Sequence, residues 1–96
     1  MKLSYIYILL CSDQTYYTGV TSNLEKRIEE HICGKHFDSY TYHRRPVQLV
    51  YYTSFTSISI AIEYEKKIKK WSKAKKQALI EGRYDDLPNL SKKKFK

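Results

Sequence analysis

Residues 4–20, SYIYILLCSDQTYYTGV, contain the pattern that decides the predicted fold. The stretch SYIYILLC over residues 4–11 is β-branched, aromatic and aliphatic, and this composition predicts a buried strand. The polar residues 12–15 predict a turn, and residues 16–20 predict a second short strand. Because no helical crossover fits between the two strands, they must form an antiparallel hairpin.

A helix is predicted directly after the hairpin. Residues 22–25, SNLE, form an S-x-x-E capping box, which marks a helix start. The helix should run from about residue 23 to about residue 32 and end near Gly34, because glycine readily adopts the left-handed conformation after a helix. The basic and aromatic residues 35–45 have no clear period and predict a loop.

One further strand and two helices complete the predicted fold. Residues 46–55, PVQLVYYTSF, predict a third strand that begins with a proline, where the missing N–H donor matters least. Helical spacing extends over residues 57–71, and a second helical piece, from about residue 73 to residue 81, should end at Gly82. The order β-β-α-β-α-α predicts an α+β fold, with a small three-stranded mixed or antiparallel sheet flanked by helices.

Length and composition predict one soluble domain. The 96 residues suffice for a single hydrophobic core, which we expect over residues 1–82, followed by a basic and loosely held tail over residues 83–96. No apolar run approaches the roughly 20 residues of a membrane span, and no signal peptide is recognised. Cys11 and Cys33 form no CxxC motif, so we expect two reduced thiols in a cytoplasmic protein, taken to be a monomer.

The formal net charge of +8 favours a polyanionic partner. DNA, RNA and an anionic membrane surface all meet that description. Ten tyrosines account for most of the aromatic residues, and tyrosine suits half-buried surfaces and binding clefts. A lysine surplus can also serve only to keep a protein dispersed, so charge alone leaves the partner open.

A carboxylate lies where the second predicted helix should face the core. On a helical wheel of residues 58–71 the apolar side chains fall in one arc, which consists of Ile58, Ile60, Ala61, Ile62, Tyr64, Ile68 and Trp71. Glu65 falls inside this arc, whereas Glu63 lies opposite with the lysines. A carboxylate directed at a core is costly unless it is paired, hydrogen-bonded or bound to a metal. Glu65 is therefore either a structural ion-pair partner or a metal-binding or acid–base group at a cleft edge.

An arginine and a histidine share one border of the first predicted helix. Its apolar stripe repeats every four residues and consists of Leu24, Ile28 and Ile32. Arg27 and His31 lie one turn apart along the edge of that stripe, and we expect Glu30 to point further out. Arginine is suited to holding a phosphate, and histidine can transfer a proton near neutral pH. The structural alternative is that Arg27 pairs with Glu30 or Glu65 and that His31 only packs at the core edge.

Two tyrosines of the hairpin can share one face of the sheet. Tyr7 and Tyr17 become cross-strand neighbours in a register that pairs residue 7 with residue 17, whereas a slip of one residue separates them. Gly19 would leave room beside them for a backbone or a ligand. The alternative is that both tyrosines are ordinary core aromatics of a strand pair.

Basic and aromatic residues interleave after the first predicted helix. This combination suits phosphate contacts together with base stacking, and the second helical region adds further lysines. A solvated lysine face is the alternative interpretation. The nucleic-acid-binding residues predicted from this pattern are Lys35, Tyr42, His43, Arg44, Arg45, Lys69 and Lys73.

Taken together, these motifs resemble the GIY-YIG endonuclease family. The family signature is a pair of tripeptides about ten residues apart, here Tyr5-Ile6-Tyr7 and Tyr17-Thr18-Gly19. An R-x-x-x-H helix follows, then RRPVQLVY over residues 44–51 and A-x-x-x-E-x-x-I-K-x-W-S-x-A-K-K over residues 61–76. The resemblance extends from about residue 4 to about residue 82 and is strongest to the small, single-domain GIY-YIG proteins of bacteria. Tyr5 and Thr18 depart from the signature, at positions that carry no chemistry in the family.

The resemblance implies a role for each of five residues. Tyr7 would activate the attacking water, Tyr17 would orient the water or the phosphate, and Arg27 would hold the scissile phosphate. Glu65 would bind a divalent cation, Mg²⁺ or Mn²⁺, and His31 matches a position used for proton transfer in part of the family. Free tyrosine has a pKa of about 10, so a cation and an arginine nearby would be needed to favour its phenolate.

Three functions remain open on the sequence alone. The first is a metal-dependent endonuclease that hydrolyses phosphodiester bonds in DNA, in DNA repair or processing. The second is a nucleic-acid-binding module that keeps the fold with little turnover, and the third is a small protein-interaction domain with incidental charge. All five catalytic positions are filled, and this favours the endonuclease.

Overall fold

A three-stranded antiparallel sheet organises the chain in the computed structural model, which describes residues 2–83. β1 (Ser4–Leu10) is the central strand, flanked by β2 (Tyr16–Thr21) and β3 (Gln48–Phe55). Both pairings in the sheet are antiparallel, so the predicted hairpin is confirmed. The third strand begins two residues later than expected, at Gln48.

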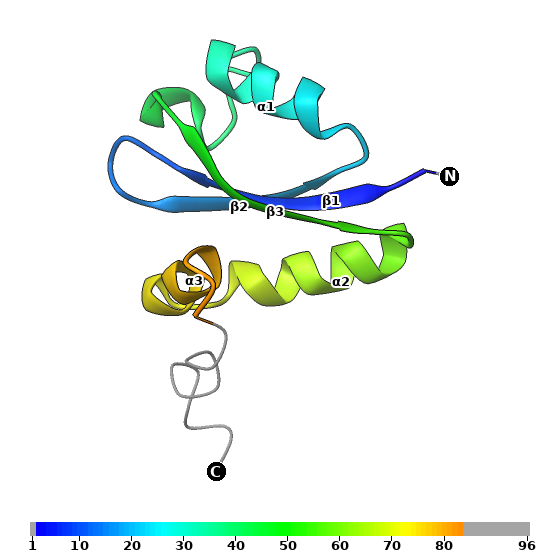
Figure 1. Ribbon diagram of the computed structural model, residues 1–96. Coiled ribbons are helices and arrows are strands. Elements are labelled where there is room, and N and C mark those ends of the chain that lie inside the picture. The colour runs from blue at the N-terminus through cyan, green and yellow to red at the C-terminus, as the bar shows by residue number, and fades with distance from the viewer. Residues whose placement is uncertain (1, 84–96) are drawn as a thin grey trace.

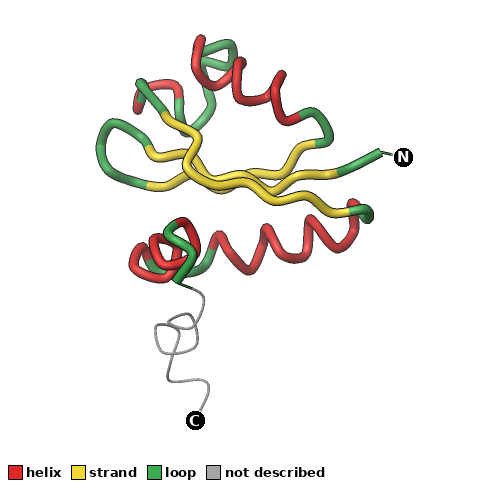
Figure 2. Tube along the Cα trace, in the orientation of Figure 1, coloured by secondary structure: helices red, strands yellow, loops and turns green. Residues whose placement is uncertain are grey.

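The sheet separates two helical layers (Figures 1 and 2). α1 (Leu24–Cys33) lies over one face, and α2 (Ile58–Lys69) with α3 (Lys73–Ile80) covers the other. This arrangement confirms the predicted α+β fold and its element order. The segment predicted as a loop contains a short 3-10 helix, η1 (Tyr42–Arg44), which the sequence pattern does not indicate.

The hydrophobic core fills the space between the sheet and the α2–α3 layer. Ile6 and Ile8 of β1 pack there against Ala61, Ile68 and Leu79 of the helices. Side chains alternate along a strand, so the residue between the two isoleucines, position 7, faces the α1 side. β1 is buried on both faces, and this explains its almost continuous apolar sequence.

The buried face of α2 is narrower than the helical wheel predicts. Four members of the predicted apolar arc are 38% to 48% exposed: Ile58, Ile60, Ile62 and Tyr64. The buried residues of α2 are Ala61, Glu65 and Ile68. A helix on one face of a sheet buries a stripe of roughly 100°, so the centre of a wider arc is covered and both margins remain exposed.

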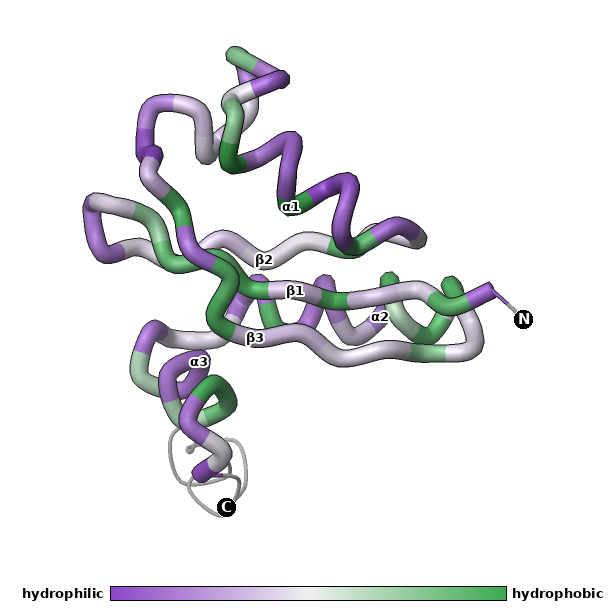
Figure 3. The backbone as a smooth tube through the Cα atoms, turned by 45° about the horizontal axis from the view of Figure 1, so that its top comes forward, coloured by the Kyte–Doolittle hydropathy of each residue, from purple (hydrophilic) through white to green (hydrophobic). Residues whose placement is uncertain are grey.

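α1 also differs from its predicted form. Its N-cap is Asn23, whose side chain accepts a hydrogen bond from the N–H of Lys26, so the expected S-x-x-E capping box is not used. Gly34 ends the helix with φ of 72°, as predicted. The expected apolar stripe is only partly covered, because Ile32 is 57% exposed and His31 is the buried residue of this mostly hydrophilic helix (Figure 3).

The tail predicted over residues 83–96 lies outside the described residues, apart from Arg83. Within residues 2–83, no helix is both long enough and apolar enough to cross a lipid bilayer. Both cysteines are free thiols, with Cys11 buried and Cys33 exposed.

Candidate active site

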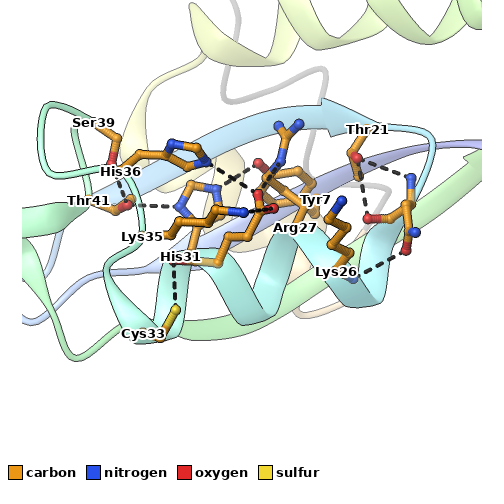
Figure 4. Close-up of polar contacts among 12 residues, drawn as sticks. Tyr7, Thr21, Lys26, Arg27, His31, Cys33, Lys35, His36, Ser39 and Thr41 are labelled. Carbon is orange, nitrogen blue, oxygen red and sulfur yellow. Dashed lines mark hydrogen bonds and ion pairs between the residues drawn. The ribbon is translucent and has the colours of Figure 1, made fainter.

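The side chains of Tyr7 and His31 meet on the α1 side of the sheet (Figure 4). The Tyr7 hydroxyl lies 2.9 Å from Nε2 of His31, at hydrogen-bond distance. Nδ1 of His31 lies 2.8 Å from Oγ1 of Thr41, which in turn lies 3.2 Å from Oγ of Ser39. A hydrogen-bonded chain therefore runs from the buried Tyr7 hydroxyl into the segment between α1 and β3.

Burial sets the protonation states of this pair. It raises the pKa of Tyr7 to about 12, with Tyr17 adding to the shift and Arg27 opposing it. It lowers the pKa of His31, and the charge of Arg27 acts in the same direction. At neutral pH, Tyr7 is therefore a phenol that donates to a neutral His31, whose Nδ1–H donates to Thr41. Tyr7 alone is a poor base, but a proton acceptor is already hydrogen-bonded to it.

Tyr17 joins this pair from the edge strand β2. The register places Tyr7 opposite Gly19, so the expected pairing of residue 7 with residue 17 is wrong by two residues. The turn over residues 11–15 is longer than that pairing requires, and a shift of two residues keeps both tyrosines on one face. The Tyr17 ring centroid lies 6.3 Å from that of Tyr7 and 5.3 Å from that of His31. Tyr17 is thus a diagonal neighbour of Tyr7.

Gly19 provides the space that the Tyr7 side chain occupies. A Cβ atom at position 19 would overlap with the hydroxyl and Cζ atoms of Tyr7. Tyr7 is fully buried and hydrogen-bonded to His31, so its ring has no free space to move into. The glycine is needed here for the close approach of a side chain to the backbone.

Gly19→Ala should therefore destabilise the fold and displace Tyr7 from His31. We expect a loss of about 1–3 kcal/mol in the free energy of unfolding, typical of an overpacked core, measured by urea denaturation. In a Tyr7→Leu background the clashing atoms are absent, so the same substitution should cost much less. An equal cost in both backgrounds would show that the overlap with Tyr7 is not the cause.

Arg27, Lys35 and His36 surround the carboxylate of Glu30 at the edge of the site. Oε1 lies 3.4 Å from Nε of Arg27 and 3.4 Å from Nε2 of His36, and Oε2 lies 3.6 Å from Nζ of Lys35. The expectation that Glu30 points outward is wrong, because the left-handed turn at Gly34 brings the following residues back over it. Of the two partners considered for Arg27, the structure shows Glu30.

The guanidinium of Arg27 remains accessible despite this ion pair. Its side chain is 43% exposed. It lines an open pocket of about 230 Å³ together with Thr21, Ser22, Asn23, Lys26 and Glu30. Its charge also lowers the pKa of both Tyr7 and His31, so it lies close to the proton-transfer pair. A planar guanidinium in this position can bind a phosphate next to that pair.

Glu65 approaches the site from α2, beyond the edge strand β2. It is 8% exposed, and this confirms the predicted burial of the carboxylate. Nζ of Lys69 lies 3.1 Å from Oε2 of Glu65 and 6.0 Å from the ring centroid of Tyr17. The charge of Glu65 also contributes to the raised pKa of Tyr7. The structure thus gathers four of the predicted catalytic residues directly, and it connects Glu65 to them through Lys69.

Glu65 could hold a divalent cation at this site. Within residues 2–83, no three His, Cys, Asp or Glu side chains form a metal-binding group. Such a donor set does not fit a closed zinc cage, but it fits Mg²⁺ or Mn²⁺ bound by one carboxylate, waters and phosphate oxygens. Lys69 now pairs with the carboxylate, and its half-exposed side chain can be displaced.

The predicted nucleic-acid-binding residues fall into two groups. The Arg44 guanidinium packs 3.8 Å over the ring centroid of Tyr40, and its Nε lies 3.0 Å from Oδ2 of Asp13. The Arg45 guanidinium packs 4.5 Å over the ring centroid of Tyr42. Both arginine side chains are therefore used in contacts that stabilise the segment around η1. The residues of the predicted set that remain exposed are Lys35, His43, Lys69 and Lys73.

Thr41 and Tyr40 complete the site, through contacts that the sequence pattern does not predict. Thr41 is almost fully buried and receives the hydrogen bond that orients His31. Tyr40 stacks on Tyr17 with ring centroids 5.7 Å apart, and its hydroxyl donates to Oγ1 of Thr15. Both contacts depend on the path of the loop before β3, which has no periodicity from which they could be predicted.

Comparisons with known proteins show the family of this chain. A family model described as the GIY-YIG catalytic domain matches residues 3–78. The UPF0213 protein of Syntrophus aciditrophicus is 50% identical over 80 residues, which cover 83% of this chain and 92% of that protein. UPF0213 protein SH2523 of Staphylococcus haemolyticus is 46% identical over 83 residues, which cover 86% and 100%. The solution NMR structure of protein EF2693 from E. faecalis has a TM-score of 0.60 at 32% identity and covers 88% of each chain. This chain therefore belongs to the GIY-YIG catalytic domain family.

Proposed function

We propose that this protein is a divalent-cation-dependent endonuclease that hydrolyses phosphodiester bonds in DNA, in DNA repair or processing. The observation that carries the proposal is the hydrogen-bond contact of 2.9 Å between the Tyr7 hydroxyl and Nε2 of His31, beside the guanidinium of Arg27. This arrangement combines a route for a proton with a phosphate-binding cation, which hydrolysis of a phosphodiester requires. Membership of a catalytic domain family supports the same conclusion.

The proton of the attacking water would leave through Tyr7. As the water oxygen bonds to phosphorus, its proton passes to the Tyr7 oxygen while the Tyr7 proton passes to Nε2 of His31. The bond from phosphorus to the leaving oxygen breaks, and solvent supplies a proton to that oxygen. His31 becomes an imidazolium whose Nδ1–H still donates to Thr41. This route needs no free tyrosinate, which a pKa of about 12 disfavours.

The other residues of the site would bind and orient the substrate. Arg27 would hold the scissile phosphate through its exposed guanidinium, and Tyr17 would position the water or a phosphate oxygen. Glu65 would hold the divalent cation, which when bound supplies positive charge to the phosphate and acidifies its waters. Lys69 would leave Glu65 and face the nucleic acid instead.

A substrate panel tests the proposal. Nicked, branched, single-stranded and duplex DNA are each incubated with the protein and Mg²⁺, Mn²⁺ or EDTA. We expect cleavage of at least one substrate with a cation and none with EDTA. Absence of cleavage on every substrate would contradict the proposal.

A nucleic-acid-binding module with little turnover is the second candidate function. The observation that favours it is the ion pair between Lys69 and Glu65, because the Lys69 ammonium pairs with the carboxylate that a divalent cation would need as its ligand. Its signature would be DNA binding that weakens steeply with salt, without cleavage under any metal condition.

The neutral state of His31 predicts how stability depends on pH. Burial holds the pKa of His31 below its ordinary value of 6.5, so the unfolded chain takes up a proton at a higher pH than the folded chain. The corresponding stabilisation is fully present above pH 6.5 and is lost as the pH falls through the lower pKa of the folded state. Between about pH 7.5 and about pH 5, the free energy of unfolding measured in urea should fall by more in the wild type than in His31→Gln. Equal losses would mean that His31 is not the group responsible.

A further inference from the structure

A pocket separate from the five proposed catalytic residues lies between the β1–β2 turn and the α3 layer. Its volume is about 270 Å³. Figure 1 shows the turn and α3 at the same end of the molecule, and the pocket is lined from both sides. The turn side contributes Asp13, Thr15 and Tyr16, and the helical side contributes Trp71, Lys73 and Lys76.

Lys76 is a buried cation on the helical side of the pocket. It is 8% exposed, and among residues 2–83 no Asp or Glu forms an ion pair with it. Burial lowers the pKa of its ammonium, and the charge of Lys69 lowers it further. A buried charge costs stability unless it is paired, and within residues 2–83 an anion bound in this pocket would supply the missing partner of Lys76.

Asp13, the carboxylate in the pocket wall, is already committed to other groups. Its Oδ1 accepts hydrogen bonds from the hydroxyl of Thr15 at 2.6 Å and from the Thr15 N–H at 3.2 Å. Its Oδ2 lies 3.0 Å from Nε of Arg44. Because Arg44 balances this carboxylate, Lys73 and Lys76 leave the pocket with an excess of positive charge.

Lys69 connects the pocket to the proposed active site. Its ammonium pairs with Glu65 on one side and acts on the pKa of Lys76 on the other. Two consecutive tyrosines of β2 also belong to different sites, because Tyr16 lines the pocket and Tyr17 lies against His31 in the proposed active site. The pocket and the proposed active site are therefore neighbours, separated by the end of β2 that joins the β1–β2 turn.

We propose that this pocket binds a backbone phosphate of the nucleic-acid strand that occupies the active site, with Lys76 as the main ligand and Lys73 as a second cation. The proposal rests on the proposed function, because the strand must pass the catalytic residues to reach the pocket. Trp71 adds an aromatic wall, fixed by the Lys75 ammonium 4.1 Å from its ring centroid. A cationic pocket with an aromatic wall suits a nucleotide better than a free anion.

Trp71 gives a direct readout of this pocket, because it is the single tryptophan of the chain. Its fluorescence is titrated with an oligothymidylate of about ten nucleotides in EDTA, so that binding is measured without cleavage. We expect a saturable change in the wild type, an affinity about tenfold lower in Lys76→Gln, and a salt dependence reduced by about one ion. Lys76→Arg keeps the charge and should bind within about threefold of the wild type.

The matched control is Lys66→Gln, which removes the same charge from an exposed position on α2. Its affinity should fall less than about twofold, as expected for a general charge effect. Lys76→Gln removes a buried charge that no carboxylate of residues 2–83 pairs with, so its Tm should equal or exceed that of the wild type, and unfolding would not explain weaker binding. Equal affinities of Lys76→Gln and Lys66→Gln would overturn the proposal.

Two further outcomes separate the pocket from the catalytic proposal. If inorganic phosphate changes the Trp71 fluorescence but Lys76→Gln binds the oligonucleotide normally, the pocket takes a small anion and the proposal fails. Cleavage is measured separately with Mg²⁺ and Mn²⁺. A wild type that binds through Lys76 but cuts no substrate would contradict the endonuclease and leave the phosphate site supported.

Discussion

Glu65→Gln is expected to reduce DNA cleavage about a thousandfold or more, because the amide cannot supply the negative charge that holds a divalent cation. The side chain keeps its size, and Lys69 can turn to solvent because it is half exposed. The free energy of unfolding should therefore change by less than about 1 kcal/mol. Cleavage rates at saturating DNA measure the loss of catalysis, and calorimetric titration of Mn²⁺ measures the loss of cation binding.

Glu63→Gln is the control for this substitution. It makes the same change of charge two residues away, on an exposed position of α2. We expect its cleavage rate and its affinity for Mn²⁺ to match those of the wild type. If Glu65→Gln also cut at the wild-type rate, the carboxylate would be only a structural partner of Lys69, which is the alternative that the sequence leaves open.

The position of Glu65 could be predicted because helical periodicity is a local property. The predicted apolar arc of α2 has the correct centre, and the structure buries Glu65 there together with Ala61 and Ile68. The width of the arc was wrong, since isoleucines at both margins are exposed. A helical wheel orders residues by direction, but the neighbouring layer decides how far around the helix burial extends.

In the hairpin, the sequence pattern likewise predicts the direction of side chains but not the strand register. Alternation along the strands predicts that Tyr7 and Tyr17 share a face, and a shift of two residues in register preserves this result. The register itself depends on the turn over residues 11–15, whose hydrogen bonds are not encoded in any period. The sequence pattern does not predict that Tyr7 contacts His31, because the two residues lie 24 positions apart in the sequence.

The surroundings of His31 could not be predicted at all. Thr41 lies in an irregular segment, and it reaches the imidazole only because the chain folds back after Gly34 and around η1. Glu30 was expected to face solvent for the same reason, since its partners Lys35 and His36 follow that turn. Local periodicity therefore singled out Glu65, Arg27 and His31, and the family resemblance implied their catalytic roles, whereas the groups that orient them depend on tertiary contacts.

Tyr7→Phe is expected to lower the rate of DNA cleavage about 10²- to 10⁴-fold, because it removes the hydroxyl through which the water proton would reach His31. The ring remains packed beside Gly19. Nε2 of His31 loses its donor, so the free energy of unfolding should fall by about 1 kcal/mol. Single-turnover cleavage separates this effect from substrate binding, and DNA affinity in EDTA should stay close to that of the wild type.

Tyr5→Phe is the matched control, because it removes a phenol hydroxyl from the same strand where the ring packs against Tyr52. Its cleavage rate should remain within about twofold of the wild type, as for a residue outside the proton route. The comparison with His31→Gln then distinguishes the two possible acceptors. Loss in both Tyr7→Phe and His31→Gln supports the relay. Loss in His31→Gln alone would mean that the imidazole takes the proton of the water directly and that Tyr7 serves only to position it.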